Sequence, residues 1–391
     1  MHSVTKDISS HDGPDSAAMS ELKVLIAAGG TGGHVYPAIA IANAIREKYT
    51  KANILFVGTK NHMEWEAVPR AGYDISNIWI SGLHRRLTLK NLLFPVKLAT
   101  SLVQSYNIIR TFDPDIAISC GGYVAGPVGW VAAQKGIPLV IQEQNSFPGV
   151  TNRLLGKKAE AIFIAFKDAE KHFPPGKTIL AGNPTRKSLV DADRQEAYRK
   201  FSFDPLTSTL LVLGGSGGAR SLNEAMLQHI STLHDELGLQ IIWQCGKRYY
   251  DQLRRDIHVR NFNRLILTDF LHDMPEAYAV ADLVISRAGA LSCSELALTG
   301  KPSILVPSPN VAGDHQTKNA ESMVKEGAAE LIPDAELSNT LPKLVETIID
   351  DEGKLKEMNK AALKLARPDA AMTIATQILE IAKKSKLKKT E

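Results

Sequence analysis

The chain has 391 residues, a formal net charge of +4, 44% hydrophobic residues and 23% charged residues. This composition is typical of a globular protein and excludes a wholly disordered chain. The length predicts two domains, because a single hydrophobic core seldom grows beyond about 250–300 residues. The mild positive charge gives no indication of a nucleic-acid partner.

The first twenty residues are polar, contain acids and have no apolar run, so we interpret them as a flexible leader and not as a signal peptide. The three cysteines, Cys120, Cys245 and Cys293, are widely spaced and odd in number. They indicate a reducing compartment and argue against a disulfide framework or a cysteine-based zinc site. No run reaches the ~18 apolar residues of a spanning helix, so any membrane contact should be peripheral.

Short apolar strands alternate with segments of helical period, which predicts parallel sheets covered by helices on both faces. Strands are expected at 23–28, 53–57, 115–119, 138–141 and 161–165, with a helix from Pro37 to Tyr49. The same plan restarts with strands at 210–213, 240–243, 265–268, 283–286 and 303–306. We therefore predict an α/β fold with two Rossmann-like domains, residues 21–184 and 185–367. A last helix, 368–385, should pack back on the first domain.

Each half has a glycine-rich turn between its first strand and its first helix, GGTGGH at 29–34 and GGSGGAR at 214–220. Glycine lets backbone amides approach a ligand closely, and the N-terminus of the following helix attracts a phosphate. The alternative is a tight turn needed only for strand–helix packing. Neither turn has the lysine of a P-loop, and Val35 stands where the dinucleotide fingerprint requires glycine. A P-loop nucleotide site and an NAD site are therefore disfavoured.

The second half adds side chains suited to a ribose and a sugar. Glu295 lies one turn into the helix expected after strand 283–286, where its carboxylate can accept two hydrogen bonds from a cis-diol. Stabilisation of the helix N-terminus is the alternative role for this carboxylate. Segment 313–319 (GDHQTKN) is rich in side chains that bind hydroxyls, or is simply the polar start of a helix.

Eight motifs occur together in one order: AGGTGGHVYP, CGGYVAGP, QEQN, GNPTR, GGSGGAR, DFLHDM, SRAGALSCSE and DHQTKNA. In their order and spacing, over about residues 22–385, the sequence resembles the bacterial undecaprenyl-pyrophosphoryl-muramyl-pentapeptide N-acetylglucosaminyltransferases. The resemblance implies the GT-B fold, in which two Rossmann-like domains face each other across a cleft, with no metal or other cofactor. It implies inverting transfer of GlcNAc from UDP-GlcNAc to the 4-hydroxyl of MurNAc in lipid I, which gives lipid II for peptidoglycan synthesis.

When the donor-binding residues of the family are assigned to this sequence by matching motif, most of the donor would lie in the second domain. Leu271 and the backbone of Ala290 and Leu291 would frame the uracil, and Glu295 would bind the ribose. The remaining members of the donor-binding set implied by the resemblance are Ser292, Cys293, Ser294, Ser216 and Arg186 with Arg287 for the pyrophosphate, and Gln316 and Asn319 for the GlcNAc hydroxyls.

The first domain would close on the donor and receive the acceptor. The resemblance implies that Thr31, Gly32, Gly33 and Asn145 close on the donor. His34 and the loop 121–126, which includes Tyr123, would face the lipid acceptor.

Direct inversion requires a base for the acceptor hydroxyl. His34 is our first choice, because a neutral imidazole is available near pH 7. The alternatives are that His34 only caps the helix or hydrogen-bonds the turn, and that Glu143 is the base. Many relatives have histidine where this chain has Gln142, so we assign no proton transfer to that position.

Residues 83–98 interleave basic and apolar side chains without an acid, and Arg85, Arg86, Lys90 and Lys97 are the basic ones. Such a stretch suits an anionic membrane surface. We expect it to dock a peripheral protein on the cytoplasmic face of the inner membrane, the alternative being a core helix with a solvated basic face. The rival functions are another GT-B glycolipid glycosyltransferase, a UDP-GlcNAc 2-epimerase-like enzyme and a non-catalytic sugar-nucleotide sensor.

Overall fold

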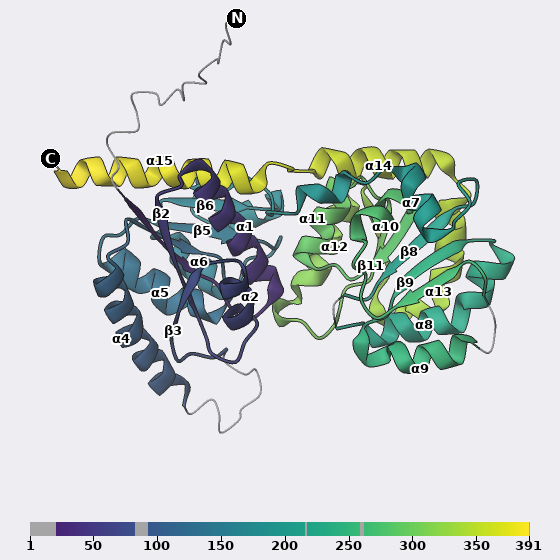
Figure 1. Cartoon of the computed structure of the whole chain (residues 1–391), viewed down its shortest axis with the longest axis horizontal. Helices are drawn as coiled ribbons and strands as arrows, with labels where there is room; N and C mark the ends of the chain where they lie inside the picture. Colours follow the sequence, from purple (N-terminus) through teal and green to yellow (C-terminus); the bar gives the residue numbers. More distant parts are fainter. Residues whose placement is uncertain (1–20, 83–92, 216, 259–261, 391) are drawn as a thin grey trace, which may run out of the picture.

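The computed structural model describes residues 21–82, 93–215, 217–258 and 262–390. They form two α/β domains that lie side by side, each built on a parallel sheet (Figure 1). The strand order is β3-β2-β1-β4-β5-β6-β7 in the first sheet and β10-β9-β8-β11-β12-β13 in the second. The predicted fold class is therefore confirmed.

The first domain begins with β1 (Leu22–Ala27), α1 (Gly32–Lys48), β2 (Ala52–Gly58), α2 (Glu64–Arg70), β3 (Asp74–Asn77), α4 (Phe94–Phe112) and β4 (Ile116–Ser119). It continues with α5 (Gly122–Gln134), β5 (Leu139–Glu143), α6 (Val150–Gly156), β6 (Ala161–Ile164), the 3-10 helix η1 (Lys167–His172) and β7 (Thr178–Leu180).

The second domain begins with η2 (Lys187–Val190), α7 (Arg194–Phe201), β8 (Thr209–Leu213), α8 (Arg220–Ser231), the π-helical turn η3 (Thr232–Glu236), β9 (Gln240–Gln244), α9 (Lys247–His258) and β10 (Leu265–Thr268). It continues with α10 (Met274–Val280), β11 (Leu283–Ser286), α11 (Ala290–Leu298), β12 (Ser303–Leu305), η4 (Ala312–Asp314), α12 (His315–Lys325) and β13 (Ala329–Leu331). The chain ends with η5 (Asp334–Glu336), α13 (Leu337–Ile349), α14 (Glu352–Leu365) and α15 (Ala370–Thr390).

The central strands are buried along their whole length, as β4, β5, β8 and β9 show. This burial explains why continuous apolar runs predicted them, since parallel strands are covered on both faces. Three strands, β3, β7 and β13, were not predicted. They have only three or four residues each and are edge strands, so their apolar signal is weak.

Helix α1 begins at Gly32, five residues before the expected start at Pro37. Proline favours the first turn of a helix, which is why the pattern pointed to residue 37. Pro37 is instead buried inside the helix. The earlier start puts His34 in the first turn, directly after the glycine-rich segment.

The last helix, α15, packs against α1, and Figure 1 shows it running along the first domain while α14 lies along the second. Ile374, Ala375, Ile378 and Ala382 are fully buried in the core that also contains β1 and β2. The chain therefore crosses from the second domain back to the first near Arg367.

Helix α4 exposes apolar side chains and buries small polar ones. Val96, Val103 and Tyr106 are 53%, 61% and 45% exposed and recur at helical spacing on one side. On the other side Ser101 and Ser105 are buried, and their hydroxyls donate to the carbonyls of Leu98 and Ser101. This is the reverse of the usual amphipathic surface helix. Among the described residues, no helix combines the length and the apolar character needed to cross a bilayer.

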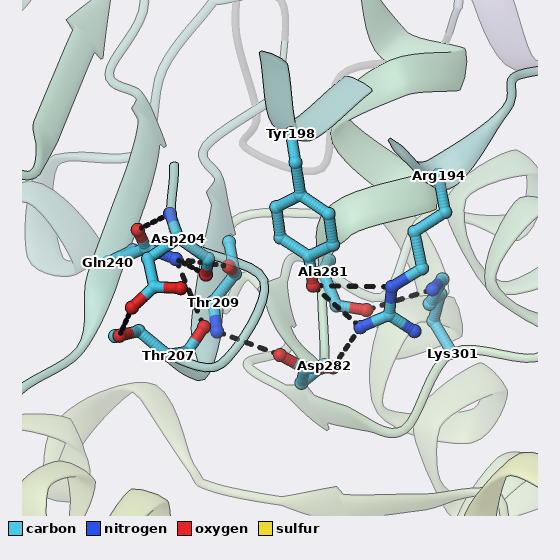
Figure 2. A network of polar contacts seen from close by, with 9 residues as sticks. All are labelled: Arg194, Tyr198, Asp204, Thr207, Thr209, Gln240, Ala281, Asp282 and Lys301. Atoms are coloured by element: carbon cyan, nitrogen blue, oxygen red, sulfur yellow. Dashed lines mark hydrogen bonds and ion pairs between the residues drawn. The ribbon is translucent and has the colours of Figure 1, made fainter. Parts of the chain in front are cut away.

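A polar network closes the amino ends of the strands in the second domain (Figure 2). The Arg194 guanidinium donates to the hydroxyl of Tyr198 and the carboxylate of Asp282, which also accepts from the backbone N–H of Thr209. Lys301 donates to the carbonyl of Ala281 at 2.8 Å. The pKa of Lys301 is lowered to about 8, mainly by burial and also by the charge of Arg194, against the opposing effect of Asp282.

The depressed pKa of Lys301 predicts a pH-dependent stability. Between about pH 8 and 10.5 the unfolded chain keeps a proton that the folded chain releases, so the free energy of unfolding should rise with pH in this window. We expect the free energy of unfolding of the wild type, minus that of Lys301→Met, to rise by on the order of 2 kcal/mol from pH 7 to pH 10. Denaturant unfolding at each pH measures it, with Lys356→Met on the exposed face of α14 as control. Parallel stability curves for the wild type and Lys301→Met would contradict the prediction.

Candidate functional site

The two glycine-rich turns lie at the carboxyl ends of β1 and β8, the strands at which each sheet changes direction. β1 pairs with β2 on one side and β4 on the other, and β8 pairs with β9 and β11 in the same way. Ligands of open α/β sheets bind in the crevice at such a switch point. The order of the strands therefore places both turns where a ligand is expected.

In the first turn, Thr31 precedes α1 and its hydroxyl lies 2.9 Å from Nδ1 of His34, while Gly32 and Gly33 open the helix. The imidazole packs against Gly121, where a Cβ would lie 2.6 Å from Cδ2 of His34. The neighbouring Gly122 has φ +79° and its Cβ would meet the Gly29 carbonyl at 2.2 Å. Only glycine therefore allows the β1–α1 and β4–α5 turns to touch.

This contact brings Tyr123 over the first turn. Its ring packs against Gly30, and its hydroxyl lies 3.3 Å from Nε2 of His62. Burial raises the pKa of the Tyr123 hydroxyl, so it remains a neutral donor. The structure thus joins His34 and Tyr123, which come from separate motifs, in one surface.

His34 is a neutral imidazole in this environment. Its pKa is lowered to about 4, mainly by burial and also by the charge of His315 of α12. A hydrogen bond to the Gly29 backbone and the charge of Glu64 act in the opposite direction. Because His315 belongs to the second domain, the two domains come close enough at this turn for its charge to act on His34.

Glu143 ends β5 and is fully buried. Its carboxylate accepts hydrogen bonds from the backbone N–H groups of Asn145 and Gly149 and from the side chain of Asn152. Burial raises its pKa, and these hydrogen bonds partly offset the rise. Because its donors come from residues 145–152, the carboxylate fixes the conformation of this loop. This arrangement favours a structural role for Glu143 over proton transfer.

Asn145 and Asn319 meet across the domain boundary. Nδ2 of Asn319 donates to Oδ1 of Asn145 at 3.2 Å and to the carbonyl of Ala288, while Oδ1 of Asn319 accepts from the backbone N–H of Ser146 at 2.9 Å. Gln316, one turn earlier on α12, accepts from the backbone N–H of Ser308. The β5 loop therefore lies directly against the start of α12.

On the second domain, Glu295 of α11 lies beside Arg186, with 3.9 Å between Oε1 and Nη2. The Glu295 side chain is 20% exposed, and the hydroxyl of Tyr278 donates to Oε2 at 3.4 Å. Burial raises the pKa of Glu295, while Arg186 and Tyr278 oppose the rise. Arg186 is 66% exposed and lies in the segment that joins the domains.

The second glycine-rich turn is tied to Leu271 through Gln244. The side chain of Gln244 donates to the Gly215 carbonyl at 2.9 Å and accepts from the backbone N–H of Leu271 at 3.2 Å. At Gly218, φ is +74° and a Cβ would lie 2.2 Å from the carbonyl of Cys245. Ser216, predicted to bind the pyrophosphate, lies outside the described residues.

The start of α11 presents the remaining predicted donor contacts. Leu291, Ser292 and Ser294 are partly exposed, whereas Ala290 and Cys293 are buried. Burial raises the pKa of the Cys293 thiol to about 12, so this thiol stays protonated and inert.

The guanidinium of Arg287 is occupied within the second domain. It donates to the carbonyls of Val306 and Pro307, to the carboxylate of Asp334 and to the hydroxyl of Ser221. Its charge is therefore paired with Asp334, and its hydrogen bond to Ser221 stabilises the start of α8, which follows the second turn. This arrangement favours an indirect effect on the pyrophosphate over the direct contact that the resemblance implied.

Models of the glycosyltransferase family 28 N-terminal and C-terminal domains match residues 24–164 and 209–374. The chain belongs to glycosyltransferase family 28. Within this family it is 45% identical to a Flavobacterium psychrophilum protein named UDP-N-acetylglucosamine–N-acetylmuramyl-(pentapeptide) pyrophosphoryl-undecaprenol N-acetylglucosamine transferase, over 94% of this chain and all of that protein. The Bacteroides fragilis protein of the same name is 46% identical over 93% of this chain and 97% of its own length.

Among solved structures, the chain is similar to the Acinetobacter baumannii MurG crystal structure, with 28% identity and a TM-score of 0.76 over 92% of this chain and 99% of that one. The Neisseria meningitidis UDP-GlcNAc 2-epimerase bound to UDP-GlcNAc has a TM-score of 0.63 at 13% identity, over 92% of this chain and 100% of that one. The second likeness concerns the fold alone. The predicted family is thus confirmed, and the chain is an enzyme of the glycosyltransferase class.

Sequence reasoning missed the role of Asn183 in this family 28 site. Asn183 is 2% exposed, accepts from the side chain of Gln142 at 3.0 Å, and donates to the Gln144 carbonyl and the Ser294 hydroxyl. Its GNPTR motif is one of the eight that carry the resemblance, but the motif alone assigns Asn183 no contact. Gln142 is therefore a hydrogen-bond donor to Asn183, a contact that the ring N–H of a histidine can also make.

Proposed function

We propose that this chain transfers GlcNAc from UDP-GlcNAc to the 4-hydroxyl of MurNAc in undecaprenyl-pyrophosphoryl-MurNAc-pentapeptide, lipid I, and so makes lipid II for peptidoglycan synthesis. The observation that carries this conclusion is the identity of about 45% over nearly the whole chain to relatives named for this transfer. The two glycine-rich turns, each at the switch point of its own sheet, are consistent with a donor in one domain and an acceptor in the other.

The transfer is a single displacement. The acceptor oxygen forms a bond to C1 of GlcNAc as the bond from C1 to the phosphate oxygen breaks, and the electron pair leaves with UDP. The hydroxyl proton goes to a base, for which we propose His34, because its imidazole is neutral and lies in the first turn of α1, close enough to α12 for the charge of His315 to act on it. Tyr123 would line the acceptor side, and Thr31, Gly32 and Gly33 would close on the donor from the same turn, as their contacts support.

On the donor side, the proposal assigns the ribose to Glu295 and the uracil to Leu271 and the start of α11. The proximity of Arg186 to Glu295 supports the ribose assignment. The link through Gln244 supports the uracil assignment, because it holds Leu271 beside the second glycine-rich turn. Amides of the second turn and Arg186 would stabilise the charge on departing UDP, as preorganised dipoles do. Asn145, Gln316 and Asn319 are the proposed partners of the GlcNAc hydroxyls.

The deciding experiment is transfer of labelled GlcNAc from UDP-GlcNAc to a lipid I analogue, with and without EDTA. We expect a lipid II analogue to form at the same rate in both. Turnover of UDP-GlcNAc without an acceptor would instead indicate an epimerase. Tight UDP-GlcNAc binding without transfer would indicate a sensor, and loss of transfer in EDTA would overturn the assignment of a metal-free reaction.

We also propose that the protein docks peripherally on the anionic cytoplasmic face of the inner membrane through residues 83–98 and α4. The segment 83–92, with Arg85, Arg86 and Lys90, lies outside the described residues. Support comes from α4, which exposes the stripe of Val96, Val103 and Tyr106. Other exposed apolar side chains lie on or beside this helix: Leu93 precedes it, the Trp79 ring lies 5.7 Å from Nζ of Lys97, and Trp130 is on α5, which packs against α4.

A double substitution tests the docking surface. The variant Val96→Asp/Val103→Asp should bind phosphatidylglycerol vesicles at least ~10-fold more weakly than the wild type, because it removes apolar contact and adds two charges that the surface repels. Co-sedimentation measures the bound fraction. Leu206→Asp, at a 94% exposed position in the second domain, is the matched control. Equal binding by the double variant and the wild type would contradict the proposal.

A further inference from the structure

Glu64, the first residue of α2, carries a fully buried carboxylate behind the first glycine-rich turn. Oε1 accepts from the hydroxyl of Thr59 at 2.7 Å and from the Thr59 backbone N–H at 3.2 Å. Oε2 accepts from the backbone N–H of Gly30 at 3.3 Å. The carboxylate therefore fixes an amide of the turn itself and the end of the adjacent strand β2.

Two glycines make room for this carboxylate. A Cβ on Gly29 would lie 2.8 Å from Oε1 of Glu64, and a Cβ on Gly58 would lie 2.8 Å from its Cγ. A buried carboxylate costs several kcal/mol of desolvation, only partly offset by such hydrogen bonds. An apolar side chain in this space would avoid that cost, so packing alone gives no reason for a charged residue here.

Glu64 lies close to the candidate reacting groups through Gly30, to which it is hydrogen-bonded and against which the ring of Tyr123 packs. Its charge acts on the imidazole of His34, which it favours in the protonated form, and on the hydroxyl of Tyr123. The other charged or titratable group that acts on His34 from a packed element is His315 of α12, which opposes protonation, as burial does. Among the described residues, Glu64 is thus the acidic side chain whose charge supports a positive His34.

We propose that Glu64 is a positioning residue of the transfer reaction, which holds the first glycine-rich turn in shape and supplies the negative charge that stabilises His34 as it takes the acceptor proton. The inference rests on the proposed function and on His34 as base. When the hydroxyl proton moves to the imidazole, a cation forms in a partly buried place. A fixed anion already in position lowers the energy of that cation without any rearrangement.

A double-mutant cycle separates this role from simple support of the fold. Glu64→Gln keeps the size of the side chain and removes its charge. We expect it to lower kcat about tenfold in the wild type but less than twofold in the His34→Ala background, since groups that act as a unit are not additive. The affinity for UDP, which binds the other domain, should stay unchanged in both backgrounds. Glu66→Gln, on the same helix but 74% exposed and paired with Arg70, is the matched control.

Each outcome bears on the inference. Equal losses in the two backgrounds, or no loss in the wild type, would overturn it while leaving the proposed function in place. No transfer by the wild type would overturn the proposed function, and this inference with it. If Glu64→Gln fails to fold, as judged by circular dichroism and UDP binding, Glu64→Asp replaces it. Because the aspartate keeps the charge but cannot span the same distance to Gly30, its kcat loss should again shrink in the His34→Ala background.

Discussion

Replacing His34 by alanine is expected to lower kcat by at least ~100-fold, within the range that a positioned general base contributes. The imidazole lies in the first turn of α1, packs on Gly121 and is close enough to α12 of the second domain for the charge of His315 to act on it. Its removal takes away the proton acceptor and leaves the donor-binding half of the cleft intact. UDP affinity should therefore change little.

The pKa of His34 adds a second, independent expectation. Because burial lowers this pKa to about 4, protonation should not remove the base until the pH falls towards that value. The kcat of the wild type should therefore show no loss from this group between pH 8 and pH 6. Steady-state kinetics with a lipid I analogue measure both effects, and His229→Ala, on α8 with its ring bonded to the Ser338 carbonyl, serves as control. A loss in His34→Ala below tenfold would remove His34 as the base.

Replacing Glu295 by glutamine is expected to weaken UDP binding and raise KM for UDP-GlcNAc by ~10- to 100-fold, because a hydrogen bond to a charged group contributes about 1.5–3 kcal/mol. The carboxylate of Glu295 is partly exposed at the start of α11 and has Tyr278 and Arg186 beside it. Both its oxygens can accept from the ribose diol, whereas glutamine offers one acceptor and no charge. The reacting carbon lies at the other end of the donor, so kcat should fall less than KM rises.

Isothermal titration with UDP measures this effect without an acceptor. Glu276→Gln, on α10 beside Lys200 and outside the proposed site, is the matched control. Unchanged UDP affinity in Glu295→Gln would show that this carboxylate only stabilises α11, the alternative that the sequence left open.

The folds of both domains followed from local patterns. Runs such as 210–213 and 283–285 are apolar throughout because parallel strands are buried on both faces, so the sequence alone predicted them. The short strand β3, with the sequence DISN, has no such pattern, and it forms because β2 offers it a partner. Helix α1 showed the same limit, since only the contacts of the turn decide that it begins before Pro37.

The orientation of α4 and the contacts of two buried glutamates could not be predicted from local patterns. The basic and apolar composition of the neighbourhood of α4 pointed to a membrane surface, but only the structure reveals that the helix turns Val96 and Val103 outward and Ser101 inward. The sequence does not distinguish the roles of Glu143 and Glu64. In the folded protein Glu143 accepts hydrogen bonds from the loop that follows it, whereas Glu64 accepts one from the turn that bears His34.

The family, the two-sheet fold and the enzyme class were determined by the sequence itself, because ordered motifs and apolar runs are local properties of the chain. The relations between the two halves were decided by the tertiary structure. Asn145 meets Asn319, Asn183 joins Gln144 to Ser294, and His315 acts on His34, although these partners are 39 to 281 residues apart in the sequence. No local pattern encodes such pairs, since each depends on how two separately folded sheets meet.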